Sequence, residues 1–588
     1  MNNNITACPL DCYDACSIVY KDEKIQATKE GHTKGFLCPH LNKYETVKRI
    51  NSPRYKGKKI SMSEALLKLK EILKGSPTSR VLHYKGHGNF GLMQDVTEHF
   101  FAQYGAVLTD GTLCDGAGEA GILEGRGSNK NMPLSQIEKS EVVILWGRNP
   151  HTTSSHLLPA LKGKTIIVID PLKTQIAKTA DLFIQIKPHT DAYLAMLLCR
   201  FLYINDDNDT EFASEFEEYY ELTQTIREKS TLDNMGVSLG DIEKILEYVN
   251  NKKVAIVCGI GIQKYRDGGD VLRAIDTFAA VLGLFGKEGC GVAYLGNSKE
   301  NIQSLFTTKA KRVSVVDTAF DAYKTVFIQG ANPLAQMPDS LRVQKAVEQT
   351  QNVVYFGLYE NETSAVADLI IPAKTFLEKD DIRTSYSHHA ILPMQKQIQS
   401  DIGISEYDLS AYLCREFAIE IEEEKKYLTY FESFAEDGVV KGREDIPYQD
   451  GFDTDDGEFL FLEEIEVDKK LNKIVMSKNK DKVKKVRSEF SLITPKSPKS
   501  LNSQFIREEF IYLHSDLGYG EGEEVKISSS IGSVMLKVKH NDDIRKDCVL
   551  IYSGTRGVNN LTSALHSYEG NSAAFQELEV FINAEENK

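Results

Sequence analysis

The sequence of 588 residues has neither a surplus of positive charge nor a long apolar run. Lysine and arginine together number 70, against 85 aspartates and glutamates, so the net charge is -15. Because phosphate binding depends on a basic surplus, this balance argues against a general nucleic-acid-binding protein. The longest apolar stretches, such as "AIDTFAAVLGLFG" at 274–286, are too short to cross a bilayer, and we expect no membrane span.

The N-terminal residues "MNNNITACPLDC" lack the marks of an export signal, namely a basic segment, an apolar segment or a twin-arginine pair. We therefore expect a cytoplasmic protein. Structural disulfides are rare in that reducing compartment, so clustered cysteines indicate a metal site or catalysis instead.

The composition is that of an ordinary globular protein, with 41% hydrophobic and 26% charged residues. The length predicts three or four structural units. Short β-rich runs that end in Gly, Pro or polar residues recur in two groups, with helical segments between or after them, which predicts an α/β fold with two Rossmann-like, doubly wound units. The runs lie at 140–150, 163–171 and 181–191, and again at 252–263, 324–333 and 352–373.

The composition changes near residue 468. A basic run at 468–490 and the Pro/Ser-rich "LITPKSPKSLNSQ" indicate a linker, and the alternating "EEVKISSSIGSVMLKVKH" predicts a small β-rich domain beyond it. We divide the chain into a cysteine-rich segment, two interleaved Rossmann-like domains, a linker and a C-terminal β domain. The predicted boundaries are 1–58, 59–463, 464–500 and 501–588.

Four of the ten cysteines lie near the N-terminus. Cys8, Cys12 and Cys16 are separated by three residues each, and Cys38 follows after 21 more. A compact loop can bring three such thiolates to three corners of a cubane while a distant fourth closes it, which predicts a [4Fe-4S] cluster. The alternative is structural zinc, although zinc sites prefer two close pairs of ligands.

A series of short motifs follows the cysteines. They read "GFLCP" (35–39), "LWGRNP" (145–150), "IDP" (169–171), "KPHTD" (187–191), "CGIGIQ" (258–263), "QGANP" (329–333), "ENETSAVADLIIPAKTFLE" (360–378) and "NNLTSA" (559–564). In this order they resemble the molybdopterin oxidoreductase family, the dimethyl sulfoxide reductase and formate dehydrogenase superfamily, over nearly the whole chain. The resemblance implies an iron-sulfur domain, a molybdenum or tungsten ion on a bis-molybdopterin guanine dinucleotide, two Rossmann-like domains that each hold one dinucleotide arm, and a C-terminal β-barrel.

The motifs also suggest cofactor-binding residues. Strand-end loops present backbone N–H groups and helix N-termini, where a pyrophosphate can bind, and Asp170 and Asp191 could accept hydrogen bonds from ribose or guanine. For any single Asp or Asn the alternative is a turn or helix cap. The predicted residues are Trp146, Gly147, Asn149, Pro150, Asp170, Pro188, Thr190, Asp191, Gly259, Gly261, Asn332, Pro333, Glu362, Thr363, Asp368 and Asn560.

The family's protein ligand to the metal usually lies between the cluster motif and the "WGxNP" loop, where this chain has "TDGTLCDGAGEAG". Cys114 is the predicted ligand, because a soft thiolate suits a metal already bound by dithiolenes. The alternatives are a buried packing cysteine, or Asp115 as the ligand. The other cysteines are expected to be packing residues: Cys199, Cys258, Cys290, Cys414 and Cys548.

Two positions depart from the family pattern. His40 stands where members commonly have a Lys between cluster and pterin, and Asp115 stands where formate dehydrogenases often have a His. The second change weakens the case for formate as substrate. His87, His388 and His389 are candidate replacements for the missing imidazole, with a structural role as the alternative.

The leading hypothesis is a redox enzyme that exchanges two electrons or an oxygen atom with a small substrate, while its cluster passes single electrons to a partner such as a ferredoxin-like iron-sulfur subunit. A formate dehydrogenase type or a sulfur-oxyanion reductase are specific forms of it. A non-catalytic electron-transfer or scaffold subunit, and a non-redox hydratase, are the alternatives from other classes.

Overall fold

The computed structural model describes residues 5–29, 31–86, 90–209, 211–295, 297–306, 309–464 and 489–584. The chain forms two compact units, each built from several separate segments. Unit 1 consists of 1–111, 298–443 and 498–507, and unit 2 consists of 112–297, 444–497 and 508–588. Within the described segments, no helix is both long and apolar enough to span a membrane.

Unit 1 is organised around an eight-stranded sheet in the order β13-β7-β6-β14-β15-β16-β4-β5. Its first six strands are parallel, and β4 and β5 are added antiparallel. The strands are β4 (Arg54–Tyr55), β5 (Lys58–Lys59), β6 (Val81–Lys85), β7 (Val107–Asp110), β13 (Arg312–Ser314), β14 (Thr325–Gln329), β15 (Asn352–Gly357) and β16 (Leu369–Pro372).

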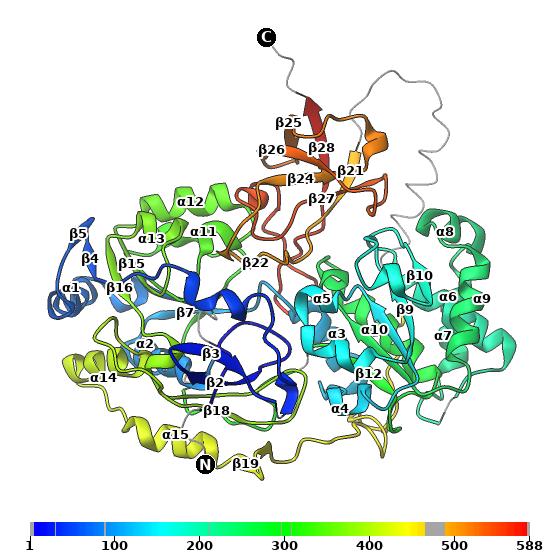
Figure 1. Cartoon of the computed structure of the whole chain (residues 1–588), viewed down its shortest axis with the longest axis horizontal. Coiled ribbons are helices and arrows are strands. Elements are labelled where there is room, and N and C mark those ends of the chain that lie inside the picture. The colour runs from blue at the N-terminus through cyan, green and yellow to red at the C-terminus, as the bar shows by residue number, and fades with distance from the viewer. Residues whose placement is uncertain are drawn as a thin grey trace. The chain divides into compact units, whose positions relative to one another are not determined.

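One face of this sheet is covered by three helices with amphipathic sequences. Leu69, Phe100 and Leu409 are fully buried there, against sheet residues that include Phe327 and Val354. Such burial of aliphatic and aromatic side chains is the main favourable term in folding. The helices are α1 (Met62–Lys74), α2 (Val96–Tyr104) and α14 (Glu406–Phe417), and Figure 1 shows α11 (Pro333–Gln336), α12 (Ser340–Gln349) and α13 (Glu362–Val366) on the other face.

Unit 2 contains a five-stranded, fully parallel sheet in the order β10-β9-β8-β11-β12. Its strands are nearly continuous apolar runs because both faces are covered, as is usual for parallel sheets. The elements are β8 (Val142–Trp146), β9 (Thr165–Ile169), β10 (Leu182–Ile184), β11 (Val254–Cys258) and β12 (Gly291–Ala293), with α3 (Gly116–Arg126), α6 (Asp191–Asn205) and α10 (Gly268–Val281) packed on one another.

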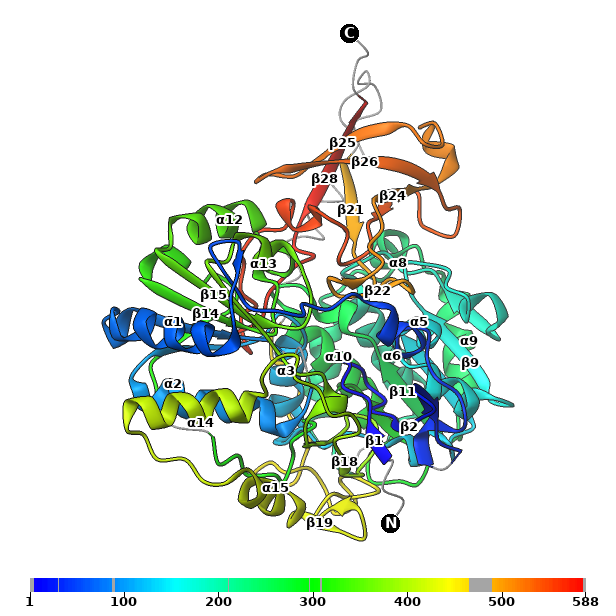
Figure 2. The ribbon, with the colours of Figure 1, turned by 60° about the vertical axis from the view of Figure 1, so that its left-hand side comes forward.

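The C-terminal part of unit 2 is a closed barrel in the order β21-β27-β24-β26-β25-β28. Alternate residues of its strands point inward and form one apolar core, as the alternating sequence predicts. Figure 2 shows most of its strands from a second side. The strands are β21 (Glu489–Ile493), β24 (Phe510–Leu513), β25 (Glu524–Ser528), β26 (Ser533–His540), β27 (Cys548–Leu550) and β28 (Glu579–Ala584).

The predicted fold class is confirmed by the two doubly wound parallel sheets and the closed barrel. The first barrel strand, β21, lies inside the segment that the sequence predicts as linker, so the barrel begins before residue 501. Phe490 and Leu492 are buried in the barrel core, and this short alternation was obscured by the basic and Pro/Ser-rich residues around it. Residues 465–488 of the predicted linker lie outside the described residues.

The cysteine-rich segment begins with a small antiparallel sheet in unit 1. Strand β1 (Ile5–Ala7) pairs with β2 (Ser17–Lys21), which pairs with β3 (Lys24–Ala27). Cys8 and Cys16 stand at the ends of the first two strands, where the Cys8 N–H donates to the carbonyl of Cys16 at 2.8 Å. The hairpin thereby closes a loop that carries Cys12.

Candidate functional site

The sheet of unit 2 has a topological switch point between β8 and β11. The chain runs from β8 outward to β9 and β10, and then returns to β11 on the other side of β8. In open parallel sheets, ligands bind at the carboxyl ends of the strands at this point. Gly147 follows β8, and Gly259 and Gly261 follow β11, so the structure brings these predicted residues to the two sides of the switch point.

Glycine is required where these two loops meet. A Cβ atom on Gly259 would lie 1.8 Å from the carbonyl oxygen of Gly147, and Gly147 itself has a φ of +64°. A side chain at Gly259 would push the two backbones apart. By contrast, a Cβ on Gly261 would meet no atom within 4 Å, so open space lies beside this backbone.

Asn149 and Pro150 form the turn after β8. Pro150 is buried at the first position of the short helix α5 (Pro150–Thr153), where its missing N–H costs nothing. The Asn149 carbonyl accepts from the N–H groups of Thr152 and Thr153, both at 3.1 Å. Its side-chain Oδ1 is buried and makes no hydrogen bond with the described residues.

Two acidic residues lie near the same strand ends. Burial raises the pKa of Asp170 to about 7, although the N–H of Leu172 donates to its carboxylate. Burial also raises the pKa of Asp191 to about 6, although the buried indole of Trp146 donates to it at 2.8 Å. Both carboxyls can therefore carry a proton near neutral pH, and a protonated carboxyl can donate a hydrogen bond as well as accept one.

The "PHTD" turn precedes Asp191. Pro188 and Thr190 lie partly buried in it, and the Thr190 hydroxyl donates to the Lys187 carbonyl at 2.7 Å. His189, which was not singled out from the sequence, has a φ of +64° and bonds to the carboxylate of Asp267 at 2.7 Å. The ligand atoms of His189, Asp267 and Glu577 all lie within 4.8 Å of one another.

The loop that carries Cys114 joins β7 to α3 and is held in place by polar contacts. The Cys114 N–H donates to the Thr112 hydroxyl at 2.9 Å, and the Gln263 amide donates to the Cys114 carbonyl at 2.6 Å. Lys264 donates to the carbonyl of Leu113 at 3.1 Å. Gln263 and Lys264 belong to the same loop after β11 as Gly259 and Gly261. The structure therefore places Cys114 next to this loop.

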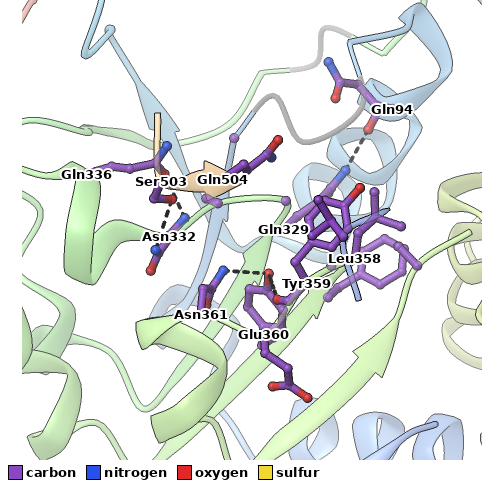
Figure 3. A pocket seen from close by; sticks show the side chains of 18 of the residues that line it. Gln94, Gln329, Asn332, Gln336, Leu358, Tyr359, Glu360, Asn361, Ser503 and Gln504 are labelled. Atoms are coloured by element: carbon purple, nitrogen blue, oxygen red, sulfur yellow. Dashed lines mark hydrogen bonds between the residues drawn. The ribbon is translucent and has the colours of Figure 1, made fainter. Parts of the chain in front are cut away.

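The sheet of unit 1 has its own switch point, between β6 and β14, and a cavity of about 140 Å³ opens there. Figure 3 shows the amide side chains gathered around it, with the Gln329 amide bonded to the Gln94 carbonyl at 3.0 Å. Most lining residues lie at the carboxyl ends of the parallel strands, and the hairpin of β22 (Ser500–Leu501) and β23 (Gln504–Phe505) supplies the rest. They include Gly86, Gly330, Asn332, Gln336, Glu360, Asn361, Ser503 and Gln504.

Asn332 is the centre of a network beside this cavity. Its amide donates to Glu362 at 2.9 Å and to the Ser503 hydroxyl at 3.1 Å, and its Oδ1 accepts from the Thr363 hydroxyl at 2.8 Å. Burial acts to raise the pKa of Glu362, but the bond from Asn332 and the charge of Arg507 lower it below its ordinary value. Three predicted residues therefore meet here, namely Asn332, Glu362 and Thr363. Pro333, the residue after Asn332, begins α11.

Two predicted residues lie elsewhere. Asp368 precedes β16 and accepts from the Val353 N–H at 2.9 Å, which places it at the amino ends of the strands, opposite the cavity. The sequence motif alone did not reveal this. Asp368 comes just before β16, whereas the cavity lies at the other, carboxyl end of that strand. Asn560 lies in a 3-10 turn next to the barrel, where its amide contacts the Ser533 carbonyl at 3.5 Å.

The four N-terminal cysteines lie in unit 1, where Cys8 and Cys16 are buried and Cys12 and Cys38 are partly buried. Burial raises the pKa of Cys8 to about 12 and also raises the pKa values of Cys12, Cys16 and Cys38. The charges of neighbouring cysteines add to the rise for Cys8, Cys12 and Cys16. Two sulfurs already accept backbone hydrogen bonds, from Asp14 to Cys12 at 3.5 Å and from Leu41 to Cys38 at 3.4 Å. Thiols of this kind lose their protons when a metal binds.

Three successive carbonyls of the cysteine loop are held by one distant segment. The Arg383 guanidinium donates to Cys12 at 3.2 Å, the Ser385 hydroxyl to Tyr13 at 3.1 Å, and the His388 ring to Asp14 at 2.9 Å. His388 is also buried and stacks on His32 at 3.8 Å, which supports its structural alternative. Sequence reasoning missed Arg383 and Ser385, because they lie about 370 residues from the loop.

The remaining histidines of interest lie in unit 1. His40 is buried, with its ring 5.8 Å from that of Phe505. His389 is partly buried, and its carbonyl accepts from the Val440 N–H at 2.9 Å. His87 lies outside the described residues. Of the other cysteines, Cys199, Cys258, Cys414 and Cys548 are buried, and Cys290 is partly buried.

The chain is similar in sequence to several known oxidoreductases. The chain is 31% identical to the probable oxidoreductase YyaE of Bacillus subtilis over 68% of this chain and 67% of that protein. It is 28% identical to the F420-dependent formate dehydrogenase subunit alpha of Methanocaldococcus jannaschii over 43% of this chain, which is 44% of that protein. The assimilatory nitrate reductase catalytic subunit of Bacillus subtilis matches at 25% identity over 47% of this chain and 46% of its own length.

The fold matches a solved structure over almost its full length. The acetylene hydratase from Pelobacter acetylenicus superimposes with a TM-score of 0.77 and covers 99% of both chains at 16% sequence identity, which shows a common fold. The family model for molybdopterin oxidoreductases matches residues 89–403, more than half of the chain. These findings confirm the predicted enzyme, and the chain belongs to the molybdopterin oxidoreductase family.

Proposed function

We propose that this chain is a cytoplasmic, molybdopterin-dependent redox enzyme with a molybdenum or tungsten ion, a bis-molybdopterin guanine dinucleotide and a [4Fe-4S] cluster. The observation that carries the proposal is the repetition of one arrangement: each unit has a parallel sheet with glycine-lined loops at its switch point. Two such sites suit a cofactor with two dinucleotide arms. Family membership supplies the pterin and the metal; the guanine form and the cluster are the finer part of the proposal.

The residues at the switch point of unit 2 suit a pterin dinucleotide. The unbonded Oδ1 of Asn149 offers an acceptor to a ligand N–H or O–H, because a buried acceptor without a partner is costly. Asp170 and Asp191, with their raised pKa values, can approach a pyrophosphate without the repulsion of two full negative charges. The closely packed glycines let the backbone reach the ligand.

The four N-terminal cysteines suit a cluster better than a single zinc ion. Tetrahedral zinc with Zn–S bonds of about 2.3 Å would hold its sulfurs roughly 3.8 Å apart. In the described part of the chain, one group of three potential metal ligands lies within 4.8 Å, and it consists of His189, Asp267 and Glu577. No three of the four cysteine sulfurs therefore lie within 4.8 Å of one another. The wider spread supports a cubane, whose thiolate ligands lie farther apart than those of one zinc ion.

Cys114 would be the protein ligand of the molybdenum or tungsten ion. The bound cofactor would supply the two-electron or oxygen-atom exchange with a small substrate. The chain's own part is to hold the Cys114 loop through Thr112, Gln263 and Lys264, so that the thiolate meets a fixed metal without a large loss of entropy. A ferredoxin-like iron-sulfur subunit would exchange single electrons with the cluster.

Anaerobic purification followed by metal and pterin analysis tests the proposal. We expect about four iron atoms and about four acid-labile sulfides per chain, together with molybdenum or tungsten. A viologen dye should then report turnover with one of formate, nitrate, thiosulfate, polysulfide or an N- or S-oxide. One zinc ion without iron would refute the cluster, absence of pterin would favour a non-catalytic subunit, and hydration of acetylene without dye turnover would make the chain a hydratase.

A further inference from the structure

Arg383 is a buried cation with no acidic partner in the part of the chain that the structure describes. Its side chain is among the largest that are fully buried, with an exposed fraction of 1%. Among the described residues, no carboxylate lies within 4.0 Å of its guanidinium nitrogens, and its Nε makes no hydrogen bond. Asp381, two residues earlier, accepts instead from the backbone N–H of Met93 at 2.8 Å and of Ile382 at 2.7 Å.

A second buried arginine, Arg126, has an acidic partner, as buried charges usually do. Arg126 in unit 2 is equally buried and forms a two-armed ion pair with the carboxylate of Asp276. A buried ion without a partner costs several kcal/mol, so a fold retains one where another negative charge compensates it. The described carboxylates form no ion pair with Arg383, so a negative charge placed on its other neighbours would stabilise it.

The contacts of Arg383 point to the cysteines. Its Nη2 donates to the carbonyl of Cys12 at 3.2 Å, its Nη1 donates to that of Phe90 at 3.3 Å, and its guanidinium lies 4.6 Å from the Phe90 ring centre. The cation is thus within electrostatic reach of thiols that bear no charge until a metal binds.

We propose that Arg383 is the fixed counter-charge of the cluster bound by Cys8, Cys12, Cys16 and Cys38, and that it raises the reduction potential of this cluster. The inference rests on the proposed function, because four thiolates around a [4Fe-4S] core leave a net negative charge. One-electron reduction adds a further negative charge, which a nearby buried cation stabilises in a low dielectric. Arg383 is a tuning residue; it binds no iron.

Asp14 supplies a charge of the opposite sign for comparison. It is 2% exposed and lies between Cys12 and Cys16 in the same loop. His388 and His32 lie beside the same loop, but burial lowers the pKa of His388 well below its ordinary value, so this ring is neutral. Removal of the Asp14 charge should therefore shift the potential in the opposite direction from removal of the Arg383 charge.

The test is a redox titration of the cluster in the full-length protein, followed by its electron paramagnetic resonance signal. Arg383→Gln should lower the ratio of reduced to oxidised cluster at a fixed potential at least tenfold, which corresponds to a fall of about 59 mV for one electron. Arg383→Lys keeps the charge and should stay close to the wild type. Lys48→Gln removes the same charge from an exposed position and should change the ratio less than twofold.

The outcomes separate this inference from the proposed function. If the wild type holds no iron, the proposed cluster is refuted before any variant is compared. If iron is present and the cluster of Arg383→Gln has the same reduction potential as that of the wild type, Arg383 is not the counter-charge. Should Arg383→Gln lose its iron, Asp14→Asn decides: a rise in the reduced fraction supports the electrostatic account, and an unchanged or lower fraction overturns it.

Discussion

The loops "WGRNP" of unit 2 and "QGANP" of unit 1 are built alike and differ in what their asparagines do. In each, the glycine after the strand has a positive φ and donates its N–H at 2.8 Å to the end of the neighbouring strand, from Gly147 to Ile169 and from Gly330 to Phe356. In each, the proline begins a short helix. Yet Asn332 bonds to three side chains, whereas the Oδ1 of Asn149 bonds to none that the structure describes.

The acidic residues near the two loops differ as well. In unit 1, hydrogen bonds and a cation lower the pKa of Glu362, although burial acts to raise it. In unit 2, burial raises the pKa of Asp170 and Asp191. The comparison teaches that one motif can occupy two environments: in unit 1 its asparagine is bonded within the fold, and in unit 2 its asparagine Oδ1 and the nearby buried carboxyls suit the proposed ligand.

The largest expected effect is on the pH dependence of stability. Burial raises the pKa of Asp170 from 3.8 to about 7, so the folded, cofactor-free protein keeps a proton that the unfolded chain has released. The unfolded state then binds fewer protons, and the free energy of unfolding falls by up to about 4 kcal/mol as the pH rises from about 4 to about 7. Asp170→Asn should remove this fall in urea titrations at pH 5 and pH 8. If the free energy of unfolding changes equally with pH in the variant and the wild type, this prediction is wrong.

Glu362→Gln is the matched variant in unit 1, with the opposite sign. Because the folded pKa of Glu362 is lowered from 4.5, its contribution to stability is present above pH 4.5 and is lost as the pH falls further. The variant should therefore be less stable than the wild type at pH 7, and the difference should shrink toward pH 3. If the difference grows in acid, the assigned partners of Glu362 are wrong.

The next effect is the loss of the asparagine network. Asn332→Ala removes the partners of Glu362, Thr363 and Ser503 in buried surroundings, which should lower the free energy of unfolding by about 3 kcal/mol. Chemical denaturation of the cofactor-free protein measures it. A loss below about 1 kcal/mol would show that the network does not stabilise unit 1.

Cys114→Ser should act on catalysis while the fold persists. If the Cys114 thiolate binds the metal, activity should fall at least roughly 10 to 100-fold and the metal's spectrum should change, while the cluster stays intact. Cys290→Ser is the control, since Cys290 is a partly buried cysteine of the same unit with no predicted ligand role. Near-normal turnover with an unchanged spectrum would exclude Cys114 and direct attention to Asp115.

The smallest expected effect on the fold is that of Asn149→Ala. Its side chain donates a single hydrogen bond, to Thr152 at 3.3 Å, so the free energy of unfolding should change by less than about 1 kcal/mol. Cofactor retention should nevertheless fall about tenfold, as expected for the loss of one buried bond to the ligand. Equal losses of stability in Asn149→Ala and Asn332→Ala would remove the distinction between the two loops.

Local sequence patterns predicted the strands, the β-rich C-terminal domain and the loops that end the strands, because each depends on neighbours within a few residues. They could not distinguish Asn149 from Asn332, since the partners of Asn332 lie 30 and 171 residues away. Arg383 contacts the carbonyl of Cys12 across 371 residues, and only the folded chain reveals it. The same limit explains Asp368, which the motif grouped with Glu362 although it stands at the opposite end of the strands.

The measurement that tests the account most directly is the number of guanine nucleotides released by acid per molybdenum or tungsten ion in the purified protein. Two dinucleotide arms, one at each switch point, predict about two guanine nucleotides per metal ion. A value of one, or none, would contradict the claim that both units hold an arm of the same cofactor.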